Sequence, residues 1–247
     1  MKRVFAFEFG DQKWVPKIFR RQLHELLQFQ VGLFYQALLP LLKNWIVENK
    51  IDQLTDLASG TGGPWHKFLP LIQKEKPNFS LQLSDINPIK NSAIPFIKHS
   101  VDLNNPSSWP EGALSIFTAF HHLKKEQIHY LLSKAVEENR PLFIAEFTER
   151  SSKRVLGMLF SFIAVWVHSP SVKPFTFTRF LFTYLLPVVP LIYLWDGAVS
   201  HLRSFSDQEL EQFCTKHSTD HYQLCSFSIP NHTQGMTLRG IYSKKKD

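Results

Sequence analysis

The chain has 247 residues, of which 44% are hydrophobic, enough for an extensive core in one large domain or two small ones. A formal net charge of +7 attracts nucleic acid, acidic substrates or anionic membranes in general. The basic residues are scattered, however, and form no stripe interleaved with aromatic residues, so nucleic acid is not the expected partner.

Cysteine usage and the first residues indicate the compartment. Cys214 and Cys225 are too few for a disulfide framework and lack metal-ligand spacing, so we expect a reducing compartment and no metal site. Glu8 and Asp11 lie near the start, and no apolar core is followed by a small-residue cleavage site, which argues against a signal peptide. These features predict a cytoplasmic protein.

Residues 1–49 are predicted to be helical. Apolar side chains recur there at spacings of three and four, at Leu23, Leu27, Val31, Phe34, Leu38, Leu42 and Trp45. Because Pro40 has no backbone N–H to donate, we expect a helix break or a new helix start near it. The apolar face is predicted to pack onto a sheet.

A strand, a glycine turn and a helix come next. Residues 51–57 supply the strand, and an apolar helical face follows at Trp65, Phe68, Leu69 and Ile72. The turn between them reads DLASGTGGP over residues 56–64. Its glycines let the backbone approach a ligand, and the start of the helix offers unpaired N–H groups. This combination predicts a nucleotide-sized binding site.

The spacing of the turn separates two kinds of nucleotide site. A dinucleotide fingerprint that starts at Gly60 needs a third glycine where this chain has Trp65, whose indole would obstruct close packing of helix on strand. The turn instead resembles the acid-x-Gly-x-Gly-x-Gly loop of class I S-adenosylmethionine-dependent methyltransferases, with Ala58 in place of the first glycine. The resemblance implies that Asp56, Ala58, Gly60 and Gly62 bind S-adenosylmethionine.

The segments that follow agree with this resemblance. Ser80 to Ser84 are predicted to form a short strand ending at Asp85, whose carboxylate can accept both hydrogen bonds of a ribose diol. Phe96 to Val101 are predicted to form a third strand, and the resemblance places the next residue, Asp102, at the adenine amino group. The alternatives are a solvated strand-end acid at Asp85 and a helix N-cap or Asx turn at Asp102.

A fourth and a fifth strand are predicted over Leu114–Phe120 and Leu142–Phe147, and the resemblance adds Phe120 to the cofactor site. The candidate catalytic residues lie at the ends of these strands: His121, His122 and Glu146. A neutral imidazole can accept a proton from a hydroxyl or phenol. The alternative is a structural histidine bonded to a loop carbonyl.

The insertion after the fifth strand, residues 151–203, is unusual. Its only formally charged residues between Val155 and Ser200 are Lys173, Arg179 and Asp196. We predict a hydrophobic helical cap at the carboxyl ends of the strands, where open α/β sheets bind ligands. The candidate acceptor-binding residues are Phe162, Trp166, Tyr193, Asp196 and Arg203. For Asp196 and Arg203, a structural ion pair is the alternative.

Other roles for the insertion stay open. A transmembrane hairpin is disfavoured because the apolar runs 155–167 and 181–195 are short and the second contains Pro187 and Pro190. A homodimer interface and a peripheral membrane contact are the other two interpretations. We favour the cap, with which a homodimer is compatible.

Residues 204–247 are predicted to close the domain. Ser206 and Glu209 form a capping box for a helix that reaches Lys216. Tyr222 to Ile229 and Met236 to Tyr242 are predicted to pair as an antiparallel hairpin. The preceding Asp-Gly-x-Val-Ser-x-Leu-Arg run resembles a segment of a poorly characterised group of bacterial methyltransferases.

The predicted architecture is a single methyltransferase domain, residues 1–247, of the α/β class. It has a seven-stranded Rossmann-like sheet, N-terminal helices, a cofactor-binding core over residues 50–150 and the helical cap. The implied activity is S-adenosylmethionine-dependent methyl transfer to a small apolar or aromatic acceptor. Two alternatives remain: a degenerate methyltransferase-like protein that binds without transferring methyl, and an NAD-dependent oxidoreductase, which Trp65 disfavours.

Overall fold

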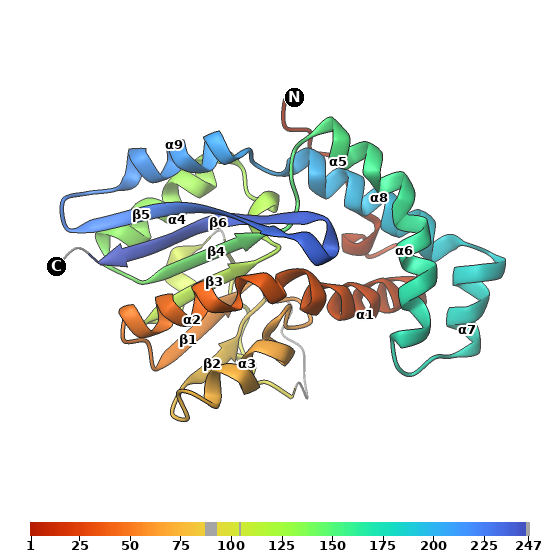
Figure 1. Cartoon of the computed structure of the whole chain (residues 1–247), viewed down its shortest axis with the longest axis horizontal. Helices are drawn as coiled ribbons and strands as arrows, with labels where there is room; N and C mark the ends of the chain where they lie inside the picture. Colours follow the sequence, from red (N-terminus) through yellow and green to blue (C-terminus); the bar gives the residue numbers. More distant parts are fainter. Residues whose placement is uncertain (87–92, 104, 246–247) are drawn as a thin grey trace. The chain divides into compact units, whose positions relative to one another are not determined.

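The computed structural model describes residues 1–86, 93–103 and 105–245 (Figure 1). The chain forms two compact units, each made of two segments. The helical unit comprises Met1–Val31 and Thr148–Phe205, and the sheet unit comprises Gly32–Phe147 and Ser206–Asp247. The division falls inside helix α1, Lys17–Phe34.

The sheet unit is built on a six-stranded sheet in the order β2-β1-β3-β4-β6-β5. The strands are β1 Gln53–Leu57, β2 Ser80–Leu83, β3 Ala113–Phe117, β4 Leu142–Glu146, β5 Tyr222–Asn231 and β6 Met236–Lys245. The first four run parallel, and β6 runs antiparallel to both β4 and β5. Every residue of β3 and β4 is buried, as expected for central strands covered on both faces.

The described residues form one strand fewer than the seven predicted. Residues 96–101, predicted as a strand, contribute a single bridge between Phe96 and Leu83. The segment follows β2 for two hydrogen bonds only, from the Leu83 N–H to the Pro95 carbonyl and from the Ile97 N–H to the Leu83 carbonyl, and then bends. Pro95 has no N–H with which to extend the ladder. The third strand was therefore a wrong prediction.

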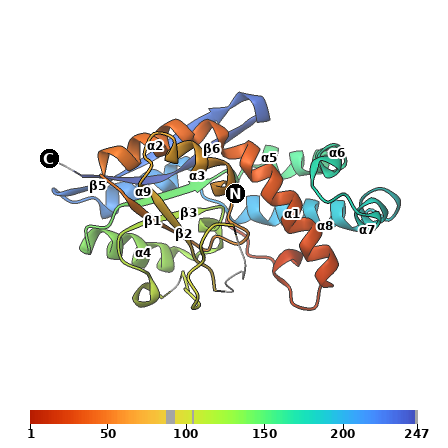
Figure 2. The same ribbon diagram turned by 90° about the horizontal axis from the view of Figure 1, so that it is seen from below.

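Helices cover both faces of this sheet (Figures 1 and 2). They are α2 Leu39–Glu48, α3 Trp65–Gln73, α4 Lys125–Glu137 and α9 Asp207–His217. On one face, Trp45 of α2 packs on Phe143 with ring centroids 5.2 Å apart, and Trp65 of α3 packs on Phe117 at 5.4 Å. Helix α4 lies on the other face, where it contacts α9. The helix start predicted at Pro40 is confirmed, because this proline lies in the first turn of α2.

The short helices of the chain have the following bounds: η1 Phe9–Asp11, η2 Tyr35–Leu38, η3 Pro106–Ser108, η4 Phe120–His122, η5 Met158–Phe160, η6 Ser169–Ser171, η7 Leu181–Leu185 and η8 His232–Gln234. All are 3-10 helices except η7, which is a π-helix. The capping box at Ser206 and Glu209 is present, and η8 with Gly235 connects the predicted hairpin. Both of these predictions are confirmed.

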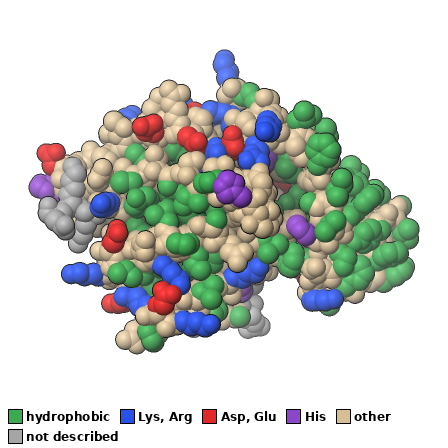
Figure 3. Space-filling view, in the orientation of Figure 1, with side chains coloured by type: hydrophobic (Ala, Val, Ile, Leu, Met, Phe, Trp, Pro, Cys, Tyr) green, Lys and Arg blue, Asp and Glu red, His purple; other side chains and the backbone are tan. Residues whose placement is uncertain are grey.

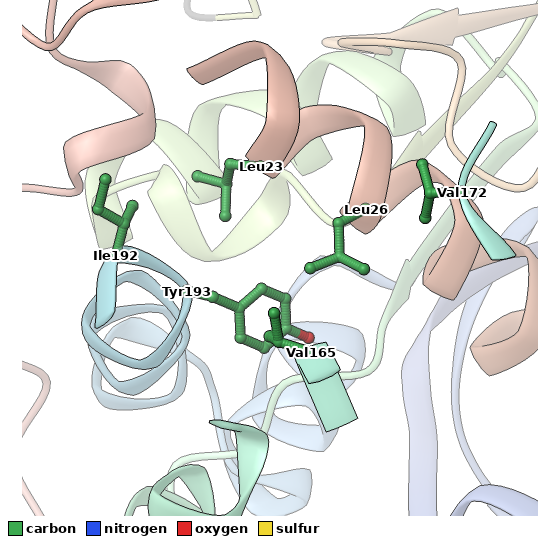
Figure 4. Packing of buried hydrophobic residues seen from close by; sticks show 6 residues of the cluster. All are labelled: Leu23, Leu26, Val165, Val172, Ile192 and Tyr193. Carbon is green, nitrogen blue, oxygen red and sulfur yellow. The ribbon is translucent and has the colours of Figure 1, made fainter. Parts of the chain in front are cut away.

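The helical unit contains the insertion and the first part of the chain. Its helices besides α1 are α5 Ser152–Gly157, α6 Ser161–His168, α7 Phe177–Phe180 and α8 Val188–Arg203. A small core joins α1, α6 and α8 (Figure 4), and its members are Leu23, Leu26, Val165, Val172, Ile192 and Tyr193. The insertion is thus helical, while its role as a cap stays a prediction.

Among the described residues, no single helix has the length and apolar composition needed to cross a bilayer. One pair of segments, Phe177–Leu185 and Val188–Arg203, meets these requirements jointly but is bent by 69° at the break between them.

Candidate functional site

The loop after β1 lies where the connections of the sheet change direction. β1 has β2 on one side and β3 on the other, so successive crossovers leave it in opposite directions. Open α/β sheets bind ligands at such a switch point, beyond the carboxyl ends of the strands. The predicted residues Asp56, Asp85, His121 and Glu146 all lie at or next to this edge.

The backbone of this loop is left-handed at four positions. φ is +52° at Ala58, +53° at Gly60, +98° at Gly62 and +48° at Gly63. Side-chain-bearing residues rarely adopt such angles, whereas glycine does so without steric cost. The glycine spacing in the sequence therefore has a conformational cause, and Ala58 adopts the conformation that the resemblance assigns to a glycine.

Three hydrogen bonds fix the loop, two of them to the residues that directly follow β2. The Ser59 N–H donates to the Ser84 carbonyl at 2.9 Å, and the Ser59 hydroxyl donates to the Asp56 carbonyl at 2.7 Å. The Gly60 N–H donates to Oδ2 of Asp85 at 3.0 Å. The structure therefore brings together two of the predicted cofactor residues, Gly60 and Asp85, which are 25 positions apart in the sequence.

The space above Gly60 is open. A Cβ atom built on Gly60 would have no heavy atom within 4 Å outside its own neighbours, whereas one on Gly62 would lie 2.8 Å from Nε2 of His66. Gly62 is thus favoured mainly by its φ of +98°, and a side chain there would also have to displace His66. Gly60 presents bare backbone to solvent beside a half-buried carboxylate.

Asp56 lies below the loop and is completely buried. Its Oδ1 accepts a hydrogen bond of 2.6 Å from the Ser115 hydroxyl on β3. Burial raises the pKa of Asp56 to about 7, against hydrogen bonds from Ser115, Trp65 and Ser59 that lower it. Its side chain therefore supports the loop from the interior.

Asp102 lies in a turn that also meets Asp85. The Val101 N–H donates to the Asp85 carbonyl at 3.1 Å, which places Asp102 one residue from that contact. The Asp102 N–H donates to the Ser108 hydroxyl at 3.2 Å, and its carbonyl accepts from the indole of Trp109 at 3.1 Å. These contacts use the backbone of Asp102, and the residue is half-buried.

His121 and Glu146 form a buried pair across the ends of β3 and β4. The Nδ1 atom of His121 lies 3.0 Å from Oε2 of Glu146, and the His121 backbone N–H donates to Oε1 at 3.2 Å. His121 is 2% exposed and Glu146 is 5% exposed. When Nδ1 carries the proton donated to Glu146, Nε2 is the atom that can accept one.

The other two predicted residues of this segment differ in burial. His122 is exposed, and its ring centroid lies 4.3 Å from that of His121. Phe120 is completely buried and belongs to the core of the sheet unit, so its side chain presents no surface to a ligand.

Two residues at this edge were missed from the sequence. Thr118, directly after β3, has φ +58°, an outlying conformation for a β-branched residue. The Tyr35 hydroxyl lies 2.9 Å from the Thr118 hydroxyl and donates to the Ala145 carbonyl at 2.9 Å. Burial is the main reason that the pKa of Tyr35 is well above its usual value. In the sequence, the one available signal was that Thr118 lies near the end of a predicted strand. Tyr35 gave no signal, because it lies 83 residues earlier in the chain.

The five predicted acceptor-binding residues all lie in the helical unit. Phe162 and Trp166 pack together with ring centroids 5.3 Å apart, and the Trp166 indole donates to the Thr183 carbonyl at 3.0 Å. Trp166 is 42% exposed. Tyr193 instead belongs to the buried core (Figure 4).

Asp196 and Arg203 both hold the start of the chain. Asp196 accepts hydrogen bonds from the N–H groups of Phe9 at 2.7 Å and Gly10 at 2.8 Å, and burial raises its pKa to about 7. Arg203 donates to Glu8 at 2.9 Å and to the Ala6 carbonyl. Asp196 and Arg203 are therefore buried in contacts within the helical unit. Phe162 and Trp166 are more exposed to solvent than these two residues.

Comparisons with known proteins place the chain by its fold. No protein-family model and no curated protein matches it. The plantazolicin methyltransferase BpumL in complex with SAH superimposes with a TM-score of 0.56 and 14% identity, over 96% of this chain and 94% of that one. BpumL with a monoazolic desmethylPZN analog and SAH gives 0.54 and 14%, over 92% and 90%.

A further structure is an O-methyltransferase family protein from Burkholderia thailandensis, with a TM-score of 0.52 and 12% identity. The superposition covers 98% of this chain and 64% of the Burkholderia protein. At these identities the likeness shows the fold. The chain therefore shares its fold with these solved methyltransferase structures, in agreement with the predicted α/β class.

Proposed function

We propose that the chain is an S-adenosylmethionine-dependent methyltransferase that acts on a small apolar or aromatic acceptor. The observation that carries the proposal is the hydrogen bond from Gly60 to Asp85, because it joins a left-handed glycine turn to a strand-end carboxylate at the switch point of the sheet. Proteins of the same fold, such as BpumL, have been solved with SAH, the product of this donor.

The residues at the loop fit such a donor. Open space above Gly60 leaves room for a ligand against the backbone, and Asp85 is exposed enough to accept hydrogen bonds from a ribose diol. Asp102 follows Val101, whose N–H contacts the Asp85 carbonyl, and from there Asp102 would contact the adenine. The bound donor would supply an activated methyl group, so the protein has mainly to align the acceptor and exclude water.

The His121–Glu146 pair is our candidate for proton removal from a hydroxyl or phenol acceptor. Glu146 holds His121 through both its ring and its backbone N–H, and this orients Nε2 as the proton acceptor. Glu146 is a positioning residue in this scheme. The exposed His122 is the second candidate base.

The apolar character of the acceptor rests on the insertion. Phe162 and Trp166 offer aromatic surface and pack against each other. Asp196 and Arg203 instead bind the N-terminal residues of the chain. Aromatic side chains bind apolar ligands over large areas and orient flat ones. BpumL, with the same fold, was solved with an azole-containing analog.

The test is thermal unfolding of the purified chain with S-adenosylmethionine, S-adenosylhomocysteine or NAD added separately. A ligand that binds the native state stabilises it by about 2.7 kcal/mol at 100 times its Kd. We expect stabilisation by the first two ligands and none by NAD. Stabilisation by NAD alone would favour the oxidoreductase, and stabilisation without turnover over a panel of phenols would favour the degenerate binding protein.

A matched pair of glycine variants separates binding from folding. Gly60→Val should abolish donor binding, because its side chain fills the open space above the loop. Gly112→Val imposes the same kind of left-handed strain, at φ +88°, just before β3 and also into open space. It should keep donor binding in calorimetry. Equal binding by folded Gly60→Val would refute the site.

A further inference from the structure

The helical unit exposes an unusual amount of apolar surface. Of the 22 large hydrophobic residues that are exposed in the described part of the chain, 18 belong to this unit. The most exposed are Phe177 at 74%, Phe160 at 70% and Trp14 at 68%. Figure 3 shows hydrophobic side chains gathered over the region that Figure 1 labels α6 and α7. Contiguous apolar surface of this kind marks a contact with a partner or a membrane.

The same unit carries the net charge of the chain. It contains 12 Lys and Arg residues and five Asp and Glu residues, a formal charge of +7, whereas the sheet unit has 16 of each and is neutral. Four of the acids contact groups of the same unit: Glu8 contacts Arg203, Glu25 contacts Arg179, Glu149 contacts Arg154, and Asp196 contacts backbone N–H groups.

The basic side chains are available at the surface. The exposed ones in this unit are Lys2, Lys13, Lys17, Arg21, Lys153 and Lys173. Lys153 is in α5, one turn before the exposed Leu156, and Lys173 is four residues before Phe177. Lysines flanking apolar side chains can extend their stems along that surface while the ammonium groups stay at the polar boundary of a bilayer.

We propose that the helical unit docks on the surface of an anionic lipid bilayer. Apolar side chains such as Phe160 and Phe177 enter the boundary of headgroups and acyl chains, and Lys153 and Lys173 contact lipid phosphates. A second copy of the chain is the weaker candidate because it would bring another unit of charge +7 against the first. The proposal does not depend on methyl transfer, since binding to vesicles needs no donor.

The experiment is flotation of the full chain with phosphatidylcholine vesicles and with vesicles of equal parts phosphatidylcholine and phosphatidylglycerol. We expect flotation with the anionic vesicles, little with the neutral ones, and a loss of binding as salt screens the charges. Lys153→Gln with Lys173→Gln should weaken binding about fivefold for each lysine. Phe160→Ser with Phe177→Ser should weaken it about tenfold for each side chain.

Matched variants in the sheet unit are the controls. Lys74→Gln with Lys98→Gln removes two exposed charges, and Val47→Ser with Tyr130→Ser removes two exposed apolar side chains, so both should leave flotation unchanged. Absence of binding to anionic vesicles, or equal binding to neutral ones, would overturn the proposal. So would a native mass that falls from dimer to monomer in the Phe160 and Phe177 variant. If that variant fails to fold, the lysine pair decides.

Discussion

The sheet unit and the helical unit differ in how they place hydrophobic side chains. The sheet unit buries them between strands and helices, as in the row of aromatic contacts formed by Trp45, Phe143, Phe117 and Trp65. The helical unit has a buried cluster of six residues that includes Tyr193, and it leaves 18 large hydrophobic side chains exposed. Hydrophobic composition alone therefore predicts neither a core nor a surface.

Buried polar groups show a second difference. In the sheet unit they meet at the carboxyl ends of strands, as Asp56, His121 and Glu146 do. In the helical unit, Asp196 and Arg203 bind the first residues of the chain. Buried polar groups thus gather at strand ends in the sheet unit and at the N-terminal segment in the helical unit, and the predictions below compare the two.

The largest effect is expected at His121. If it is the base for a hydroxyl acceptor, His121→Gln should lower kcat by about two to four orders of magnitude, with donor affinity nearly unchanged. His122→Gln tests the second candidate base separately, because His122 is exposed whereas His121 is buried against Glu146. Turnover is followed as S-adenosylhomocysteine release with a phenol acceptor found by screening. Unchanged turnover in both variants would mean that transfer proceeds by positioning alone.

The two buried aspartates should give stability a pH dependence. Burial raises the pKa of Asp56 from 3.8 to about 7, so the native state binds more protons than the unfolded state between these values. Stability from this group is present below about pH 4 and falls by about 4 kcal/mol as pH rises to about 7. Asp56→Asn should remove that fall, measured by urea unfolding across this range.

Asp196 should give the helical unit a pH dependence of stability of its own. Its pKa is also raised to about 7 by burial, so its contribution falls in the same direction as pH rises. Asp196→Asn should flatten the pH dependence of the helical unit without changing that of the sheet unit, as followed by hydrogen exchange at α8 and β4. An identical pH profile in wild type and both variants would contradict the two shifts.

A smaller effect is expected from two buried tyrosines. Tyr35→Phe removes hydrogen bonds to Thr118 and to the Ala145 carbonyl, and should destabilise the chain by about 1–3 kcal/mol. Tyr193→Phe should cost less, because its hydroxyl makes no hydrogen bond to a described residue. Denaturant unfolding compares the two. A larger loss for Tyr193→Phe would show that the helical unit has polar contacts of its own at this tyrosine.

The smallest effect is expected at helix N-caps. Ser206→Ala removes one side of the capping box of α9 and should cost about 1 kcal/mol. Thr176→Ala removes the cap of the four-residue helix α7, where Thr176 accepts from the Arg179 N–H at 3.2 Å, and should cost less. Thermal unfolding measures both. Equal losses would indicate that α7 contributes as much to stability as the longer helix.

The elements that could be predicted were those with a local pattern. The strand, turn and helix around Gly60 follow from an apolar run, left-handed glycines and a helical apolar face, all within about 20 residues. The capping box at Ser206 is likewise a short-range signal. The strand predicted over 96–101 was wrong because apolar content could not show that pairing with β2 stops after Phe96.

At the site, the sequence by itself determined the type of loop and the acid after β2, because both arise from the backbone angles and chain spacing of a few neighbouring residues. It could not separate His121 from His122, which are adjacent and chemically identical. Tertiary structure decided that His121 is buried on Glu146 and that Tyr35 reaches Thr118. Burial and pairing depend on residues distant in sequence, which only the packing of strands and helices brings together.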